Sequence, residues 1–363
     1  MAVKVKSCDV LKAAIPLKQP YVLSFATVAD IFSVIIRITL DNGMVGLSEA
    51  VPLPGYSEES KETILSDCCS IVPKIIGLSL EEIYEKLQQD LQQSHFVRSA
   101  IYTSCEVAAG LVAMPLSLKL PLLAPISSSN DLNDIQKKVA GFYREGFRTI
   151  KLKTGKNIDF DLLTTEFLLN ELPEGIKIRI DANQAYTFEE AASLLKKLDH
   201  PRNYLIELFE QPFGIDEDGW EMFSRLAPRS EHIPLMLDES IFSISDVTRA
   251  HNCGASFVKL KLFKHQGIQE LLRMAQHAKE LGVKVILGNG VSSDIGNLLE
   301  AIAFQESGLF YGAFEGNGFE KLVDTLLVNP LRIVDGDLVW ENSAGDHVAD
   351  MMKSELVDVV YNF

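Results

Sequence analysis

The chain has 363 residues, of which 47% are hydrophobic and 23% are charged, which is enough for a large core and more than one domain. Its formal net charge of −16 argues against nucleic acid or an anionic membrane as the main partner. We therefore expect a globular protein that has neither of these partners.

The cysteines and the N-terminal residues favour a cytoplasmic protein. The five cysteines are odd in number and include no CxxC pair of the kind that binds metals, so we expect reduced thiols. The first ten residues, MAVKVKSCDV, contain no apolar stretch typical of a signal peptide. The most apolar run, IFSVIIRITL, contains Arg37 and is too short to cross a bilayer.

Residues 1–120 are predicted to form a small α+β domain. Strands are expected in VKVKSCDVLKAAIPL and DIFSVIIRITL, and the dipeptide Asn42-Gly43 predicts a hairpin turn into MVGLSEAVP. From Ser57 to Met114, apolar residues recur at spacings of three and four, as on one face of a helix. Strands followed by helices are typical of the α+β class.

In residues 121–325, short apolar runs alternate with amphipathic stretches of helical length. The eight runs are PLLAPI, RTIKLK, IKIRIDA, YLIELFE, IPLMLDE, SFVKLKL, VKVILGN and LFYGAFE. Their ends, from Lys153 to Glu315, follow one another at steps of 23 to 29 residues, which predicts an α/β fold of the TIM-type (β/α)8-barrel class. A doubly wound sheet would usually carry a Gly-rich phosphate loop after its first strand, and the sequence has none. We expect residues 326–363 to pack back on the first domain.

Three neighbouring strands of the predicted barrel end in a carboxylate, namely Asp181, Glu210 and Asp238. Active sites of such barrels lie at the C-terminal ends of the strands. Three hard oxygen ligands from adjacent strands suit Mg²⁺, for which Mn²⁺ could substitute. The alternative is that each carboxylate caps the helix that follows it. We favour the metal site because three successive strands share the pattern.

Two pairs of lysines flank these carboxylates. Lys151 and Lys153 share one face of the second strand, and Lys259 and Lys261 share one face of the sixth. These strands are opposite in a ring of eight, so Lys153 and Lys261 would face each other across the barrel mouth. The other lysine of each pair would disfavour protonation of its neighbour through like charge. Two opposed bases beside a metal suit the removal of a proton next to a carboxylate.

The chain resembles the enolase superfamily, and within it the muconate-lactonizing-enzyme subgroup. The resemblance covers essentially the whole length and is carried by IKLKTG, RIDANQAY, FEQPF, LDES and VKLKLFKHQG. It implies a modified, enolase-like barrel (121–325), an N-terminal capping domain (1–120) and a C-terminal segment (326–363). It also implies that Lys153 and Lys261 are catalytic and that the three strand-end carboxylates bind Mg²⁺.

The resemblance further implies supporting residues and substrate contacts. Asn183 and Glu239 would orient ligands or lysines, with Lys151 and Lys259 as further supporting residues. Two loops of the capping domain would close over the barrel mouth. The candidate substrate contacts are Tyr21, Phe25, Tyr56, Asn289, Glu315 and Asn317.

Departures from related enzymes bear on the reaction. The mandelate-racemase branch has a histidine at the end of strand seven, where this chain has LGNGVSSD. Dipeptide epimerases have Asp-x-Asp on strand eight, where this chain has Glu315 and Asn317. Glu315 could bind a substrate ammonium or pair with a lysine of the barrel mouth. The pieces LGNGV and EGNGF are similar to cis-3-hydroxyproline dehydratases.

These features predict a Mg²⁺-dependent isomerase that acts on a small-molecule carboxylate. The favoured reaction is racemisation or epimerisation of an amino acid, an N-acyl amino acid or a dipeptide. A dehydratase, a muconate cycloisomerase or an o-succinylbenzoate synthase would use the same lysines and metal, because all of these reactions pass through an enolate. A barrel that only binds a ligand is a further alternative, but it would be expected to have lost a lysine or a carboxylate. The resemblance also implies a homo-oligomer.

Overall fold

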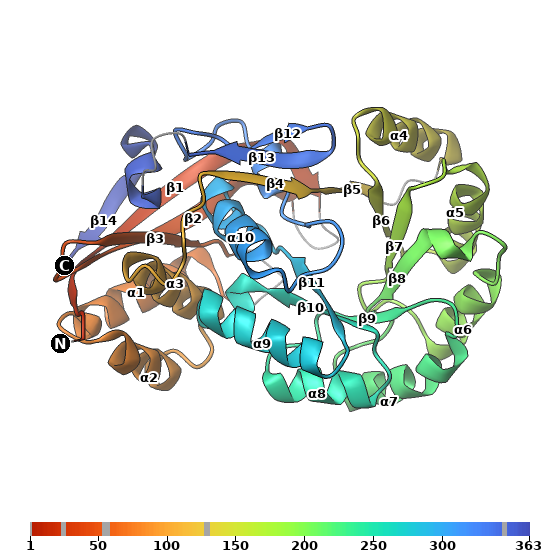
Figure 1. Cartoon of the computed structure of the whole chain (residues 1–363), viewed down its shortest axis with the longest axis horizontal. Helices are drawn as coiled ribbons and strands as arrows, with labels where there is room; N and C mark the ends of the chain where they lie inside the picture. Colours follow the sequence, from red (N-terminus) through yellow and green to blue (C-terminus); the bar gives the residue numbers. More distant parts are fainter. Residues whose placement is uncertain (1, 23–26, 53–58, 127–130, 343–346) are drawn as a thin grey trace.

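The computed structural model describes residues 2–22, 27–52, 59–126, 131–342 and 347–363. Antiparallel sheets and helices from the N-terminal part of the chain lie beside a curled parallel sheet with helices on its outer side (Figure 1). The predicted α/β class with an N-terminal cap is therefore confirmed. No helix among these residues is long and apolar enough to cross a membrane.

The capping sheet has the strand order β14-β1-β2-β3. Its strands are β1 (Val5–Val22), β2 (Thr27–Leu40), β3 (Val45–Ala50) and β14 (Asp358–Asn362). The turn predicted at Asn42-Gly43 is present: Gly43 has φ +86°, which glycine tolerates, and the side chain of Asn42 accepts a hydrogen bond from the backbone N–H of Met44. Because β14 pairs with β1, the C-terminus lies beside the first strand (Figure 1).

The two faces of the capping sheet belong to different cores. Val34 and Ile36 pack with helices α1 (Lys61–Ile75), α2 (Leu80–Asp90) and α3 (His95–Ala108). Ile35, which points to the opposite face, belongs to the large core that continues into the parallel sheet. The alternation of apolar residues along β2 therefore joins the cap to the rest of the molecule.

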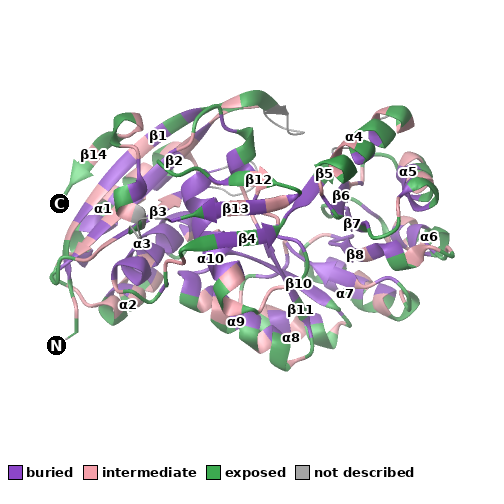
Figure 2. Ribbon diagram, turned by 45° about the horizontal axis from the view of Figure 1, so that its top comes forward, coloured by how far each residue is buried: buried purple, intermediate pink, exposed green. Residues whose placement is uncertain are grey.

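Seven strands form the curled parallel sheet. They are β5 (Leu123–Ile126), β6 (Thr149–Lys153), β7 (Lys177–Asp181), β8 (Ile206–Glu210), β9 (Leu235–Leu237), β10 (Phe257–Lys261) and β11 (Lys284–Gly288), paired in chain order. Figure 2 shows that most residues of these strands are buried. The helices are α4 (Leu132–Arg144), α5 (Ile158–Glu171), α6 (Phe188–Lys197), α7 (Glu217–Leu226), α8 (Ile244–Asn252), α9 (Ile268–Glu280) and α10 (Asp294–Ser307).

The eighth predicted strand, LFYGAFE, forms isolated parallel bridges instead of a regular strand. Phe310 bridges Val285 of β11, and Phe314 bridges Leu122 next to β5, so this run connects the two ends of the parallel sheet. Its middle residue, Gly312, has φ +70° and cannot continue an extended strand. A side chain there would also collide with Arg179, since a Cβ atom would lie 2.7 Å from its guanidinium.

A three-stranded antiparallel sheet lies outside the predicted elements. It consists of β12 (Arg332–Val334), β13 (Asp337–Glu341) and β4 (Ser117–Pro121), in that order. Asp335 and Gly336 turn between β12 and β13 with φ of +50° and +77°, the backbone form that favours such a dipeptide.

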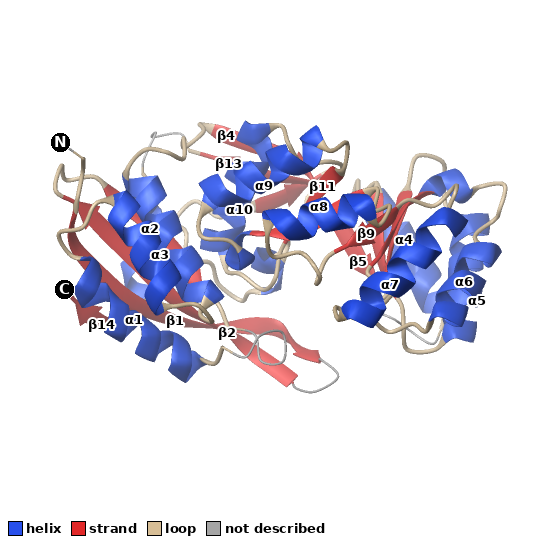
Figure 3. Ribbon diagram, turned by 90° about the horizontal axis from the view of Figure 1, so that it is seen from below, coloured by secondary structure: helices blue, strands red, loops and turns tan. Residues whose placement is uncertain are grey.

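Two carboxylates of the cap, the buried Glu106 and the half-buried Glu49, hold the starts of helices α9 and α10. Figure 3 shows these two helices between the cap and the helices α4 to α7. Glu106 of α3 accepts hydrogen bonds from the backbone N–H groups of Ile268 (2.6 Å) and Gln269 (3.1 Å) at the start of α9. Glu49 of β3 accepts from the backbone N–H groups of Ser293 (2.8 Å) and Gly296 (2.9 Å) at the start of α10. Helix N-termini favour negative charge, so these contacts fix the cap on the parallel sheet.

Candidate active site

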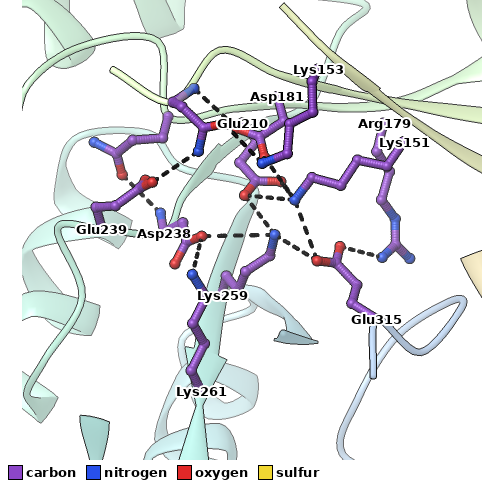
Figure 4. A network of polar contacts seen from close by, with 12 residues as sticks. Lys151, Lys153, Arg179, Asp181, Glu210, Asp238, Glu239, Lys259, Lys261 and Glu315 are labelled. Atoms are coloured by element: carbon purple, nitrogen blue, oxygen red, sulfur yellow. Dashed lines mark hydrogen bonds and ion pairs between the residues drawn. The ribbon is translucent and has the colours of Figure 1, made fainter. Parts of the chain in front are cut away.

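The three carboxylates expected to gather do lie together. Asp181 and Glu210 are the last residues of β7 and β8 and are paired in register, and Asp238 directly follows β9. All three are buried, with exposures of 0 to 2%. The C-terminal ends of three neighbouring parallel strands therefore place three acidic groups at one edge of the sheet (Figure 4).

The lysines alternate with these carboxylates in a continuous row. Lys151 Nζ lies 2.8 Å from Asp181 Oδ2 and 2.9 Å from Glu210 Oε2. Lys259 Nζ lies 2.5 Å from Glu210 Oε1 and 3.8 Å from Asp238 Oδ2. Each of these ammonium groups therefore lies between two neighbouring carboxylates.

Lys153 and Lys261 stand at the two ends of the row. Lys153 Nζ is 2.5 Å from Asp181 Oδ2, and Lys261 Nζ is 2.7 Å from Asp238 Oδ2. The side chain of Lys153 is 37% exposed, whereas that of Lys261 is 5% exposed. The two lysines expected to oppose each other thus lie on opposite sides of the carboxylates (Figure 4).

Asn183 and Glu239 continue the network beyond Lys153. Asn183 Oδ1 accepts a hydrogen bond from Lys153 Nζ at 2.8 Å, and its Nδ2 donates to Glu239 Oε1 at 3.1 Å. The backbone N–H of Asn183 donates to Asp181 Oδ1 at 3.0 Å. Asn183 therefore contacts both a lysine and a carboxylate of the row.

Glu315 binds the two lysines in the middle of the row. Its Oε2 atom is 2.9 Å from Lys259 Nζ and 3.3 Å from Lys151 Nζ, and its Oε1 accepts a hydrogen bond from Arg179 Nη1 at 2.8 Å. Of the two partners considered for Glu315, the structure therefore shows the lysines of the barrel mouth.

These contacts set the charge states of the site. Burial alone would raise the pKa of Asp181, but the ammonium groups of Lys151 and Lys153 outweigh it and hold this pKa below its usual range. Burial opposes ionisation of Asp238 and Glu315 too, yet nearby lysines keep the pKa of each below its usual range. Burial would lower the pKa of Lys151, but the surrounding carboxylates raise it. Lys151 is therefore held as an ammonium group between its carboxylates.

Two buried cations of the site were missed by sequence reasoning. Arg179 is fully buried on β7 and binds Glu207 as well as Glu315. Lys264 donates to the backbone carbonyl oxygens of Asp238 (2.8 Å) and Ile241 (3.3 Å). The sequence contains a clue to each of them. Arg179 shares a strand face with Asp181, and Lys264 is the third lysine of VKLKLFK.

A pocket of about 150 Å³ opens beside Lys151 and Lys153. Three of the candidate substrate contacts line it, namely Asn289, Glu315 and Asn317. The other three lie in the cap: Tyr21 is in β1, but its side chain is outside the described residues, as are Phe25 and Tyr56 altogether.

The donor set fits a divalent cation such as Mg²⁺. It offers three buried carboxylates from adjacent strands, the hard oxygen chemistry that Mg²⁺ prefers. Each pair of neighbouring carboxylates already shares one ammonium group, which is that of Lys151 or of Lys259. With the lysines in these positions, no three acidic, cysteine or histidine side chains of the described residues are arranged to hold a metal.

Comparison with known proteins agrees with this geometry. Residues 134–345 match the family model "Enolase C-terminal domain-like", and residues 6–109 match the N-terminal domain model of mandelate racemase / muconate lactonizing enzyme. The L-Ala-D/L-Glu epimerase of Bacillus subtilis is 26% identical over 81% of this chain and 82% of that protein. Muconate cycloisomerase 1 of Acinetobacter baylyi is 25% identical over 94% and 95%.

Solved structures show the same fold. An enolase-superfamily member from Roseovarius nubinhibens, whose crystal structure is complexed with magnesium, covers the full length of both chains with a TM-score of 0.84 and 20% identity. The family models together match most of the chain, including both the cap and the parallel sheet. The chain therefore belongs to the mandelate racemase / muconate lactonizing enzyme family and is an enzyme of the enolase superfamily.

Proposed function

We propose that this enzyme is a Mg²⁺-dependent isomerase that racemises or epimerises the carbon next to the carboxylate of an N-acyl amino acid or a dipeptide. The observation that carries the proposal is the row of alternating charges with Lys153 at one end and Lys261 at the other. A reaction that removes a proton from one face of a carbon and returns it to the other needs two such groups. The similarity to an epimerase supports the same reaction class.

In this proposal Asp181, Glu210 and Asp238 hold the metal ion. Bound Mg²⁺ would stabilise the negative charge that develops on the substrate carboxylate when the neighbouring carbon loses its proton. Carboxylates that held the cation would no longer be full counter-ions of Lys153 and Lys261, so either lysine could give up a proton and act as a base.

The two lysines act in turn. The neutral Nζ of Lys153 takes the proton from one face of the carbon, and the ammonium of Lys261 gives a proton to the other face. The roles are exchanged for the opposite configuration. Asn183, which binds Lys153 and is bound to Glu239, keeps the Lys153 amine in position.

A cycloisomerase that acts on an unsaturated dicarboxylate is the second candidate. It is favoured by the similarity to muconate cycloisomerase 1, which extends over 94% of this chain. Such a reaction needs only one proton-transferring lysine, whereas racemisation needs two. A dehydratase would also show unequal roles, since one lysine would remove the proton and the other would assist loss of a hydroxyl.

Solvent deuterium exchange distinguishes these reactions. Both enantiomers of N-acyl amino acids and dipeptides are incubated with the enzyme and Mg²⁺ in D2O, and exchange of the α-proton is followed by NMR. Lys153→Ala is expected to stop exchange of one enantiomer and Lys261→Ala that of the other, each by about 10²–10⁴-fold. Lys156→Ala, an exposed residue beyond the end of β6, is the control and should leave both rates unchanged.

Loss of exchange of both enantiomers in only one of the two lysine variants would favour the cycloisomerase or the dehydratase. Wild-type rates in both variants would contradict the mechanism. Full exchange by enzyme stripped with EDTA would contradict the metal requirement.

A further inference from the structure

One buried lysine next to the carboxylate row has no role in the proposed reaction. Lys264 is the last residue of a 3₁₀ helix, η3 (Leu262–Lys264), which directly follows Lys261 at the end of β10. Its side chain is only 3% exposed. Burial of an ammonium group is costly unless its N–H bonds find acceptors, so the groups around Lys264 Nζ indicate what this residue does.

The ammonium group of Lys264 lies against a single turn, Asp238–Ile241, which follows β9. It donates to the backbone carbonyl oxygens of Asp238 (2.8 Å) and Ile241 (3.3 Å), and its third close acceptor is Asp238 Oδ1 at 3.4 Å. The ring centre of Phe242, the next residue, is 4.7 Å from Nζ. Because an ammonium group has three N–H bonds, the turn alone offers an acceptor for each of them.

Gln211 holds the same turn from the neighbouring strand β8. This residue is 1% exposed and directly follows Glu210. Its Oε1 accepts a hydrogen bond from the backbone N–H of Asp238 at 2.8 Å, and its Nε2 donates to Ser240 Oγ at 2.9 Å. The turn is therefore held through an N–H group by a residue that follows β8 and through carbonyl oxygens by a lysine of η3.

Helix α3 of the cap fixes the segment that carries Lys264. Ser99 Oγ donates to the backbone carbonyl oxygen of Leu262 at 2.9 Å. The ring of Phe96 stacks on that of Phe263, with the ring centres 4.5 Å apart. A side chain on a segment that is held in this way can keep the turn in one position.

The turn carries two groups of the candidate site. Asp238 Oδ2 lies 2.7 Å from Lys261 Nζ. Glu239 Oε1 accepts a hydrogen bond from Asn183, which itself binds Lys153. A displaced turn would therefore disturb a carboxylate beside one lysine and the support of the other. A displacement of about 1 Å is enough to cost about 100-fold in the rate of an enzyme.

We infer that Lys264 is a positioning residue of this enzyme, which holds the turn Asp238–Ile241 in the place that the two-lysine reaction needs. The inference rests on the proposed function, which assigns Asp238 to the metal ion and the two end lysines of the row to proton transfer. Lys264 acts through Asp238 on one side of the row and through Glu239 on the other. Both directions of the reaction therefore depend on it.

Kinetics of α-proton exchange test this role, with each variant measured at saturating Mg²⁺. Lys264→Met, which removes the N–H bonds of the side chain, is expected to lower kcat for both enantiomers by about 10- to 100-fold. KM should stay near the wild-type value, because Lys264 supports the turn and not the substrate. Lys264→Gln keeps N–H donors and should show the same change in a milder form. Lys156→Met is the control for loss of a positive charge and should change neither constant.

Backbone hydrogen exchange in EDTA, followed by mass spectrometry, gives a second measurement that does not depend on the reaction. The N–H of Ile241 donates to the carbonyl oxygen of Asp238 at 3.0 Å and closes the turn. In Lys264→Met, the peptide that contains this N–H is expected to exchange about 10- to 100-fold faster, the effect of losing one hydrogen bond to a charged group. Helix α5 serves as the internal reference.

A wild-type kcat in Lys264→Met, or a loss that lies in KM alone, overturns the positioning role and leaves the reaction in place. Equal acceleration of hydrogen exchange in the turn and in α5 overturns it as well, because that pattern reports only a general loss of stability. If the wild type exchanges no α-proton but the turn of Lys264→Met opens faster than α5, the proposed reaction is wrong and the hold of Lys264 on the turn stands.

Discussion

Lys259 carries a positive charge in the interior of the sheet and is 1% exposed. It holds Glu210 and Glu315 at 2.5 and 2.9 Å. Lys259→Met would leave these buried carboxylates with one cation fewer, which is expected to lower the unfolding free energy by about 3–5 kcal/mol in EDTA. In saturating Mg²⁺ the loss should be smaller, because the metal replaces the missing charge. Urea unfolding under both conditions measures the difference.

Lys156→Met, which removes an exposed lysine, is the control and should cost little under either condition. An equal loss for Lys259→Met with and without Mg²⁺ would mean that Glu210 and its neighbours do not hold the cation.

Glu300 is a buried acid behind the pocket, hydrogen-bonded to the side chains of Asn289 and Asn297. Burial raises its pKa to about 8, so the folded protein holds this carboxyl protonated at neutral pH. Because folding raises this pKa, the protonated carboxyl contributes its full stability at pH values below the unfolded pKa of about 4.3. That contribution is lost as the pH rises through the folded pKa of about 8.

The neutral variant Glu300→Gln removes this titration. The unfolding free energy of the variant, relative to the wild type, is therefore expected to rise steadily between pH 5 and about pH 8. Chemical denaturation across this range provides the measurement. A difference that does not change with pH would show that Glu300 is ionised in the folded protein at neutral pH.

Individual residues of the site could be predicted as far as strand periodicity reaches. Asp181 and Lys153 could be placed at strand ends because parallel strands end at one edge of the sheet. The partners of Glu315 could not be predicted, because Arg179, Lys151 and Lys259 come from other strands. A long side chain can reach several charged neighbours, and periodicity does not show which of them it contacts. The catalytic and metal-binding roles remain predictions.

At the scale of elements, helix α9 lacks a capping side chain of its own. Its N-cap residue is Gly267, with φ +93°, and Glu106 of the cap accepts the hydrogen bonds of the first turn instead. Glu106→Ala would leave buried N–H groups without an acceptor and is expected to lower the unfolding free energy by about 1–3 kcal/mol. Glu106→Gln, which keeps one acceptor oxygen, should cost less. Urea unfolding compares the two, and equal losses would contradict the capping role.

The elements differed in how far the sequence could predict them. β1 to β3 and β5 to β11 follow clear apolar patterns and turn signals. The eighth run is as apolar as the others, but the positive φ of Gly312 reduces it to isolated bridges, and a one-residue backbone change is not visible in periodicity. The hairpin of β12 and β13 has a turn signal in Asp335-Gly336, yet its third strand, β4, lies more than 200 residues earlier in the chain.

At the scale of the whole molecule, two cores have to respond together when a ligand binds. The proposed metal ligands end strands of the parallel sheet, whereas the second core lies between the capping sheet and α1 to α3. The cap and the sheet are joined by Ile35 and its neighbours on one face of β2, and by Glu106 and Glu49 at the starts of α9 and α10. A ligand that binds only the native state stabilises every part that unfolds with it.

We therefore expect Mg²⁺ to slow hydrogen exchange in α1 and α3 as much as in β7 and β8. At a Mg²⁺ concentration 100 times its dissociation constant, the unfolding free energy would rise by about 2.7 kcal/mol. The Glu106→Ala variant loses one contact between the cap and the parallel sheet. The protection by Mg²⁺ should therefore persist in β7 and β8 of this variant but decrease in α1 and α3. Hydrogen exchange followed by mass spectrometry, with Ca²⁺-free buffers and an EDTA reference, resolves both regions. Protection confined to β7 and β8 in the wild type would show that the cap unfolds independently. An equal gain in both regions of Glu106→Ala would show that the Glu106 contact does not couple the cap to the parallel sheet.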